Sequence, residues 1–172
     1  TIQPETVTLV AGRPSHGKTT VLLNLFLNMV QKYPGRNFFY FSYEETRKQL
    51  ALKLVNILGG HTISEKQNLK QLEYYLRGEN RTTEAIHKAA DIFDNLTRSE
   101  RLFLLDDPLP VVELVRTIAD IKRNYSVGAI FIDYIQKIKP SSKFGTRQLE
   151  LQDISARILD TSRIFSVPVI LG

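Results

Sequence analysis

The chain alternates short apolar runs with longer segments in which apolar residues recur every three or four positions. The short runs are rich in β-branched and aromatic residues, as is typical of buried strands. The predicted strands are Val7–Ala11, Asn37–Ser42, Arg101–Leu105, Gly128–Asp133 and Val167–Leu171. The longer segments have the spacing of amphipathic helices. They predict helices over Lys18–Lys32, Thr46–Leu58, Pro110–Tyr125 and Gln148–Phe165.

Glycine and proline mark the ends of these segments. Pro34-Gly35 stops the first helix, and Gly59-Gly60 closes the second. The polar stretch His61–Ser99 predicts two further helices, one starting at Ser64 and the other at Thr82 or Thr83.

Strands that are apolar throughout and alternate with helices indicate a parallel sheet covered on both faces. The fold class is therefore α/β, and we assign residues 1–172 to a single domain, because we find no repeat or linker. The chain begins at Thr1 and stops at Gly172, directly after an apolar run. A buried strand needs neighbours on both sides, so we expect this sequence to be part of a longer protein.

Composition narrows the function classes. The chain has no cysteine, and its histidines, His16, His61 and His87, are scattered, so we do not expect a thiolate or histidine metal cluster. No apolar run approaches the roughly 20 residues of a membrane helix, and we see no signal peptide, so we expect a cytoplasmic protein without a membrane partner. The net charge of +5 is compatible with a polyanionic partner.

The loop after the first predicted strand matches the phosphate-binding motif G-x-x-x-x-G-K-S/T at every fixed position, with a strand before it and a helix after it. Glycines let backbone N–H groups converge on a phosphate, and the start of the helix directs its positive dipole end to the same point. We expect Lys18 to reach the β- and γ-phosphates of ATP and the Thr19 hydroxyl to coordinate Mg²⁺. The expected nucleotide contacts are Gly12, Arg13, Pro14, Ser15, His16, Gly17, Lys18, Thr19 and Thr20.

A second magnesium anchor is expected at the carboxyl end of a neighbouring parallel strand. Asp133 stands there, after an apolar run that favours a central strand. Asp106 and Asp107 are alternatives that also follow an apolar strand, although a turn or helix cap would explain them equally.

Hydrolysis also needs a carboxylate that polarises the attacking water. Glu44 and Glu45 both follow the Asn37–Ser42 strand at its carboxyl end. From the residues alone, either could be the base, and both could simply favour the dipole of the next helix.

Together these motifs resemble the C-terminal motor domain of DnaB-type replicative DNA helicases. The resemblance covers nearly the whole chain and is weakest between residues 60 and 100. The similar segments are IQPETVTLVAGRPSHGKTT at residues 2–20, FYFSYE at 39–44, LALKL at 50–54, the strand end at Phe103–Pro108, IDYIQ at 132–136, Ile154-Ser155 and Val167–Val169. The resemblance implies a RecA-like P-loop fold with the third, second, fourth, fifth and first strands side by side in that order. It also implies that Glu44 is the catalytic base.

Some positions depart from that family's pattern. His16 and Glu45 stand where the family has methionine, Tyr43 where it has leucine, and Pro108 where threonine is common. None of these changes removes a catalytic group. The family's sensor glutamine and arginine finger lie after the fifth strand, so we expect these 172 residues alone to hydrolyse ATP poorly.

The segment Tyr134–Arg147 is a predicted basic loop with four cationic residues and no acid. Cationic loops bind nucleic-acid phosphates, although a solvated surface loop has the same composition. In the resembling family, loops at this position face single-stranded DNA, which makes Lys143 and Arg147 the candidate DNA contacts.

The function implied is an ATP- and Mg²⁺-dependent motor that translocates on single-stranded DNA. The resemblance further implies a homo-hexamer of the full-length protein, with primase and a helicase loader as candidate partners. Two alternatives keep the same site: a RecA-like recombination or regulatory ATPase without helicase activity, and an assembly module that binds nucleotide without turnover.

Overall fold

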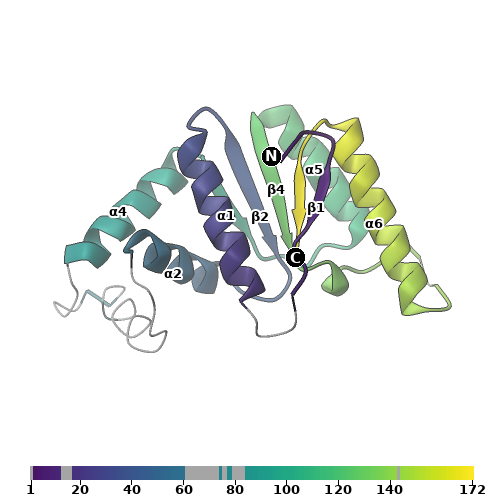
Figure 1. The fold of residues 1–172 in the computed structure, drawn as a ribbon, viewed down its shortest axis with the longest axis horizontal. Helices are drawn as coiled ribbons and strands as arrows, with labels where there is room; N and C mark the ends of the chain where they lie inside the picture. Colours follow the sequence, from purple (N-terminus) through teal and green to yellow (C-terminus); the bar gives the residue numbers. More distant parts are fainter. Residues whose placement is uncertain (1, 13–16, 61–73, 75–76, 79–83, 143) are drawn as a thin grey trace.

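A computed structural model describes the chain apart from residues 1, 13–16, 61–73, 75–76, 79–83 and 143. Its central sheet contains five parallel strands (Figure 1). The strands are β1 (Val7–Leu9), β2 (Asn37–Ser42), β3 (Leu102–Leu105), β4 (Val127–Asp133) and β5 (Val169–Leu171). Their order across the sheet is β3-β2-β4-β5-β1, which confirms the order that the resemblance implied.

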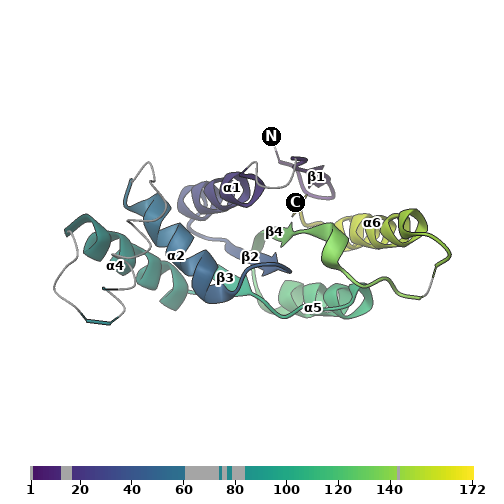
Figure 2. The same cartoon turned by 90° about the horizontal axis from the view of Figure 1, so that it is seen from below.

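Helices cover both faces of this sheet (Figures 1 and 2). One face carries α1 (Lys18–Lys32), α2 (Arg47–Leu58) and α4 (Glu84–Arg98), each of which contributes buried residues to one cluster with the sheet. A smaller cluster joins α2 and α4. The other face carries α5 (Val111–Asn124) and α6 (Arg147–Ile164). The prediction of a parallel sheet between two helical layers is confirmed.

The aromatic strand β2 contributes side chains to the hydrophobic clusters on both faces of the sheet. Phe39 and Phe41 belong to the cluster under α5 and α6, whereas Phe38 and Tyr40 belong to the cluster under α1. This alternation follows from the two-residue repeat of a strand. Because helices cover both faces, every second position is buried on each side, and the run therefore reads as continuously apolar.

The helix boundaries follow local signals. Thr46 caps α2 through a capping box with Gln49, so Thr46 precedes the first helical turn rather than lying in it. Pro110 likewise takes the N-cap position of α5. α4 begins at Glu84, beside the predicted start at Thr82 or Thr83, and the other predicted helix, from Ser64, lies outside the described residues.

The predicted basic loop is shorter and more ordered than its composition suggests. A short 3₁₀ helix, η1 (Ile135–Lys137), follows β4 directly. α6 begins at Arg147 because the side chain of Thr146 caps the helix by accepting a hydrogen bond from the Leu149 N–H. The helix therefore begins one residue before the predicted start at Gln148.

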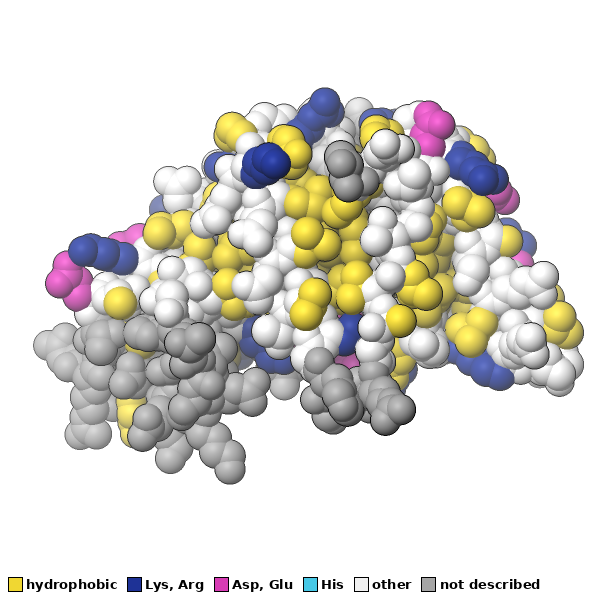
Figure 3. All heavy atoms as spheres, in the orientation of Figure 1, with side chains coloured by type: hydrophobic (Ala, Val, Ile, Leu, Met, Phe, Trp, Pro, Cys, Tyr) yellow, Lys and Arg dark blue, Asp and Glu magenta, His cyan; other side chains and the backbone are white. Residues whose placement is uncertain are grey.

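Glycine is required where β4 passes β2. A Cβ atom added at Gly128 would lie 2.5 Å from the Phe38 ring, which no side chain tolerates without a shift. On the surface, Figure 3 shows hydrophobic side chains gathered over the middle of the face that carries α1. Leu9 of β1 and Val21 of α1 are among the exposed ones.

Candidate active site

The start of α1 has the backbone geometry of a phosphate-binding turn. Gly17 adopts a left-handed conformation with φ 76°, which favours glycine, and the helix begins at the next residue, Lys18. The first backbone N–H groups of a helix have no partner within it and carry its positive dipole end. Four predicted contacts, Arg13 to His16, lie outside the described residues.

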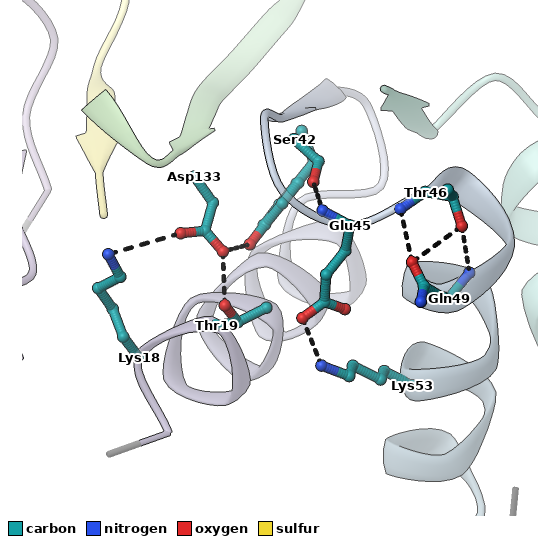
Figure 4. Close-up of polar contacts among 9 residues, drawn as sticks. Lys18, Thr19, Ser42, Glu45, Thr46, Gln49, Lys53 and Asp133 are labelled. Carbon is teal, nitrogen blue, oxygen red and sulfur yellow. Dashed lines mark hydrogen bonds and ion pairs between the residues drawn. The ribbon is translucent and has the colours of Figure 1, made fainter. Parts of the chain in front are cut away.

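Asp133 ends β4, the middle strand of the sheet, and faces the start of α1 (Figure 4). The Thr19 hydroxyl donates a hydrogen bond of 2.7 Å to Asp133 Oδ2. The Lys18 ammonium lies 3.9 Å from Asp133 Oδ1 and 4.2 Å from the centre of the Tyr134 ring. The structure therefore brings the phosphate-binding motif and Asp133, which were predicted from separate parts of the sequence, together in one place.

Asp133 is buried, with 3% of its surface exposed, and its two oxygens are used unequally. Oδ2 accepts a second hydrogen bond of 2.9 Å, from the Tyr40 hydroxyl. Oδ1 has no hydrogen-bond partner among the described residues. Burial, with the negative charges of Asp133 and Glu45, raises the pKa of Tyr40 well above its usual range, so the hydroxyl stays protonated and donates.

The two glutamates after β2 lie in different surroundings. Glu44 is exposed. Glu45 is partly buried and forms an ion pair of 2.6 Å with Lys53 of α2, while its Oε2 is buried without a hydrogen-bond partner in the described chain. The Glu45 N–H donates to the Ser42 hydroxyl at 3.0 Å, which fixes the turn between β2 and α2 (Figure 4).

The alternative aspartates are placed elsewhere. Asp106 follows β3, the edge strand next to β2. It accepts a hydrogen bond from the Arg47 backbone N–H at the start of α2 and forms an ion pair of 2.9 Å with the Arg47 side chain. Asp107 is exposed. Asp106 thus stabilises the first turn of α2, rather than the turn before Pro108 and Pro110 that was considered for it.

Of the two candidate DNA contacts, Lys143 lies outside the described residues. Arg147 forms an ion pair of 2.5 Å with Glu150 and donates to the backbone carbonyl of Gln136. Its guanidinium is therefore tied to the loop after β4 and remains half exposed.

Sequence reasoning missed Tyr40 and Lys53. Tyr40 lies inside an aromatic strand, where a hydrophobic role explains it fully, and its hydroxyl is the only signal of a polar partner. Lys53 lies on α2, eight residues after Glu45, and only the path of the chain between β2 and α2 brings the two charges together.

Comparison with known proteins identifies relatives over the same span. The family model described as DnaB-like helicase C terminal domain matches residues 1–172. The replicative DNA helicase DnaB of Rickettsia typhi is 30% identical over 174 residues, covering 94% of this chain and 32% of that protein. A probable replicative DNA helicase of Trieres chinensis is 30% identical over 182 residues, covering 98% of this chain and 35% of the relative. The chain thus spans about a third of the length of these relatives.

Solved structures have the same fold. A DnaB-like replicative helicase, described together with its interactions with primase, superposes with a TM-score of 0.81 at 20% identity, over 99% of this chain and 39% of that chain. A solved ATPase domain gives the same TM-score and identity over 98% of this chain and 57% of that chain. The RecA-like α/β fold predicted from the sequence is confirmed, and the chain belongs to the family of DnaB-like helicase C-terminal domains.

Proposed function

We propose that this chain is the ATP-hydrolysing motor domain of a hexameric replicative DNA helicase, which unwinds duplex DNA by translocating on single-stranded DNA. The observation that carries the proposal is the 2.7 Å contact between Thr19, at the start of α1, and Asp133, at the carboxyl end of β4. Ligands of open parallel sheets bind at the carboxyl ends of the strands, and triphosphates bind at helix N-termini. Both features meet at this contact.

The residues fit a magnesium ion. Asp133 Oδ1 is a buried carboxylate oxygen without a hydrogen-bond partner among the described residues, and the Thr19 hydroxyl supplies a second oxygen ligand beside it. Mg²⁺ is commonly held by one or two protein oxygens together with phosphate oxygens and water. Asp133 and Thr19 would hold the ion there, and the ion would supply positive charge against the negative charge that develops on the phosphates.

The chain's own groups divide the remaining work. Lys18 and the N-terminal N–H groups of α1 place positive charge against the phosphates. Glu44 is proposed to hold the attacking water and accept its proton, because its carboxylate is exposed at the carboxyl end of β2. Glu45 suits this task less well, since Lys53 already occupies one of its oxygens.

DNA binding and assembly extend the proposal beyond the nucleotide site. Lys143 and Arg147 are the proposed DNA contacts, since their segment follows the same sheet edge as Asp133. Primase and a helicase loader are proposed partners, the former because a similar helicase has been described with primase. The proposed location is the cytoplasm. No helix in the described ranges is long and apolar enough to cross a membrane.

The first experiment tests the nucleotide site. Lys18→Ala removes the side-chain charge directed at the phosphates, and losing one partner of such a pair costs about 2–5 kcal/mol, or roughly 30-fold or more in affinity. Binding of a fluorescent ATP analogue with Mg²⁺ measures this loss. The control is Lys32→Ala at the far end of the same helix, which should bind like the wild type. Equal affinity of the Lys18 variant would contradict the site assignment.

The second experiment tests the motor. The full-length protein should hydrolyse ATP faster with single-stranded DNA and should unwind a forked duplex. DNA-stimulated hydrolysis without unwinding would indicate a recombination or regulatory ATPase instead. Nucleotide binding without DNA-stimulated hydrolysis would indicate an assembly module.

A further inference from the structure

Tyr40 connects the hydrophobic core to the proposed magnesium site. Its ring is fully buried in the middle of β2 and packs edge-on against Phe26 of α1, with ring centres 5.4 Å apart, and in a stack with Phe131 of β4 at 6.0 Å. The ring therefore has one defined position. The hydroxyl at its tip leaves this apolar packing and donates to Asp133.

The hydroxyl is specific to this position of the strand. Four consecutive aromatic residues, 38 to 41, lie in the buried part of β2, and three of them are phenylalanines. Tyr40 and Phe38 share the face under α1, and Tyr40 is the one nearer the carboxyl end, where Asp133 lies. A phenylalanine would fill the same core space, so packing alone does not explain a tyrosine.

The other groups around Asp133 are groups that a nucleotide would also contact. Thr19 and Lys18 are the proposed ligands of the metal and the phosphates, so they change partners when Mg·ATP binds. Tyr40 lies beneath them in the core and has no such second task. Its bond to Oδ2 can persist, which leaves Oδ1 as the oxygen without a hydrogen-bond partner among the described residues.

We propose that Tyr40 is the positioning residue for Asp133: its hydroxyl holds Oδ2 so that the carboxylate keeps one orientation and Oδ1 stays directed to the magnesium ion. This inference rests on the proposed nucleotide site. Hydrogen bonds to metal-binding carboxylates commonly orient them, and their loss typically lowers metal affinity about 10- to 100-fold.

The test removes one oxygen atom. Tyr40→Phe keeps the ring and deletes the donor, and Tyr43→Phe is the matched control, since the Tyr43 hydroxyl also donates a 2.9 Å hydrogen bond, but to the carbonyl of Leu109. Binding of a fluorescent ADP analogue to the full-length protein is titrated with Mg²⁺ and repeated in EDTA. We expect Tyr40→Phe to need about 10-fold more Mg²⁺ for half-maximal enhancement of binding. Affinity in EDTA should stay within about twofold, and Tyr43→Phe should follow the wild type in both conditions.

Three results would overturn the inference. A Mg²⁺ curve for Tyr40→Phe that coincides with the wild type would show that the hydroxyl does not position Asp133. A variant that loses nucleotide binding equally with and without Mg²⁺, or that does not fold, would show that the hydroxyl supports the fold rather than the metal site. The ring cannot explain either result, because Tyr40→Phe retains it. If the wild type itself binds nucleotide without any effect of Mg²⁺, the proposed metal site fails and the role of Tyr40 fails with it; the first two results leave that site standing.

Discussion

The adjacent residues Glu44 and Glu45 offer a sharp test, because the structure places them in different surroundings. Glu44→Gln removes the proposed base, since an amide cannot accept a proton from water. General-base catalysis contributes about 10²- to 10⁴-fold, so the full-length protein should lose at least about 100-fold in ATP turnover. Glu44 is exposed, and the free energy of unfolding of the variant should therefore stay within about 0.5 kcal/mol of that of the wild type.

Glu45→Gln should show the opposite pattern. Its partner Lys53 lies 2.6 Å away, with 36% of the lysine and 22% of the glutamate side chain exposed. An exposed pair contributes about 0.2–1 kcal/mol and a charge-assisted hydrogen bond about 1.5–3 kcal/mol. This half-buried pair falls between them, at about 1–2 kcal/mol, which corresponds to roughly 2–8 °C in the melting temperature of a domain of this size. Turnover should fall by less than about 10-fold.

Urea unfolding and steady-state ATP hydrolysis, measured on the same samples, separate the two effects. Glu84→Gln is the matched control for stability, because the Glu84–Lys88 pair is as short, at 2.7 Å, but largely exposed. Glu84→Gln should lower the free energy of unfolding by less than about 0.5 kcal/mol. If Glu45→Gln abolishes hydrolysis while Glu44→Gln remains active, the base has been assigned to the wrong glutamate. If Glu45→Gln is as stable as the wild type, the ion pair with Lys53 contributes little to the free energy of unfolding.

Two further changes test how the core supports the site. Phe26→Ala removes a fully buried ring that packs edge-on against Tyr40 and Phe131, with ring centres 5.4 and 5.1 Å away. It should lower the free energy of unfolding in urea by about 3–5 kcal/mol. Val21→Ala on the exposed side of α1 should change stability little, and similar losses for both variants would contradict the packing argument. Gly172→Ala would place a Cβ atom 2.7 Å from both Asp133 Oδ1 and the buried Leu22 side chain, at a strain of about 1–3 kcal/mol. It should therefore weaken Mg²⁺-dependent binding of an ATP analogue, whereas unchanged binding would mean that Asp133 Oδ1 is not the critical oxygen.

Local patterns were sufficient to predict most of the fold and part of the site. The phosphate-binding motif is contiguous, so its residue spacing, the preceding strand and the following helix can all be read within one short stretch of sequence. Strands buried on both faces read as unbroken apolar runs, which indicated a parallel sheet before any contact was known. Asp133 could be proposed because parallel strands present their carboxyl ends at one edge.

Tertiary structure decided what depends on side-chain direction. Thr19 and Asp133 are 114 positions apart, and only the pairing of β4 between β2 and β5 places their oxygens in hydrogen-bond contact. The sequence does not reveal whether Glu44 or Glu45 pairs with Lys53. The turn after β2 sets the direction of each glutamate side chain, and the position of α2 sets where Lys53 lies. Tyr40 reads as one more aromatic residue in a buried strand. Its hydroxyl acquires a polar role only because the alternation of β2 and the packing of Phe26 and Phe131 direct it to a carboxylate on the neighbouring strand.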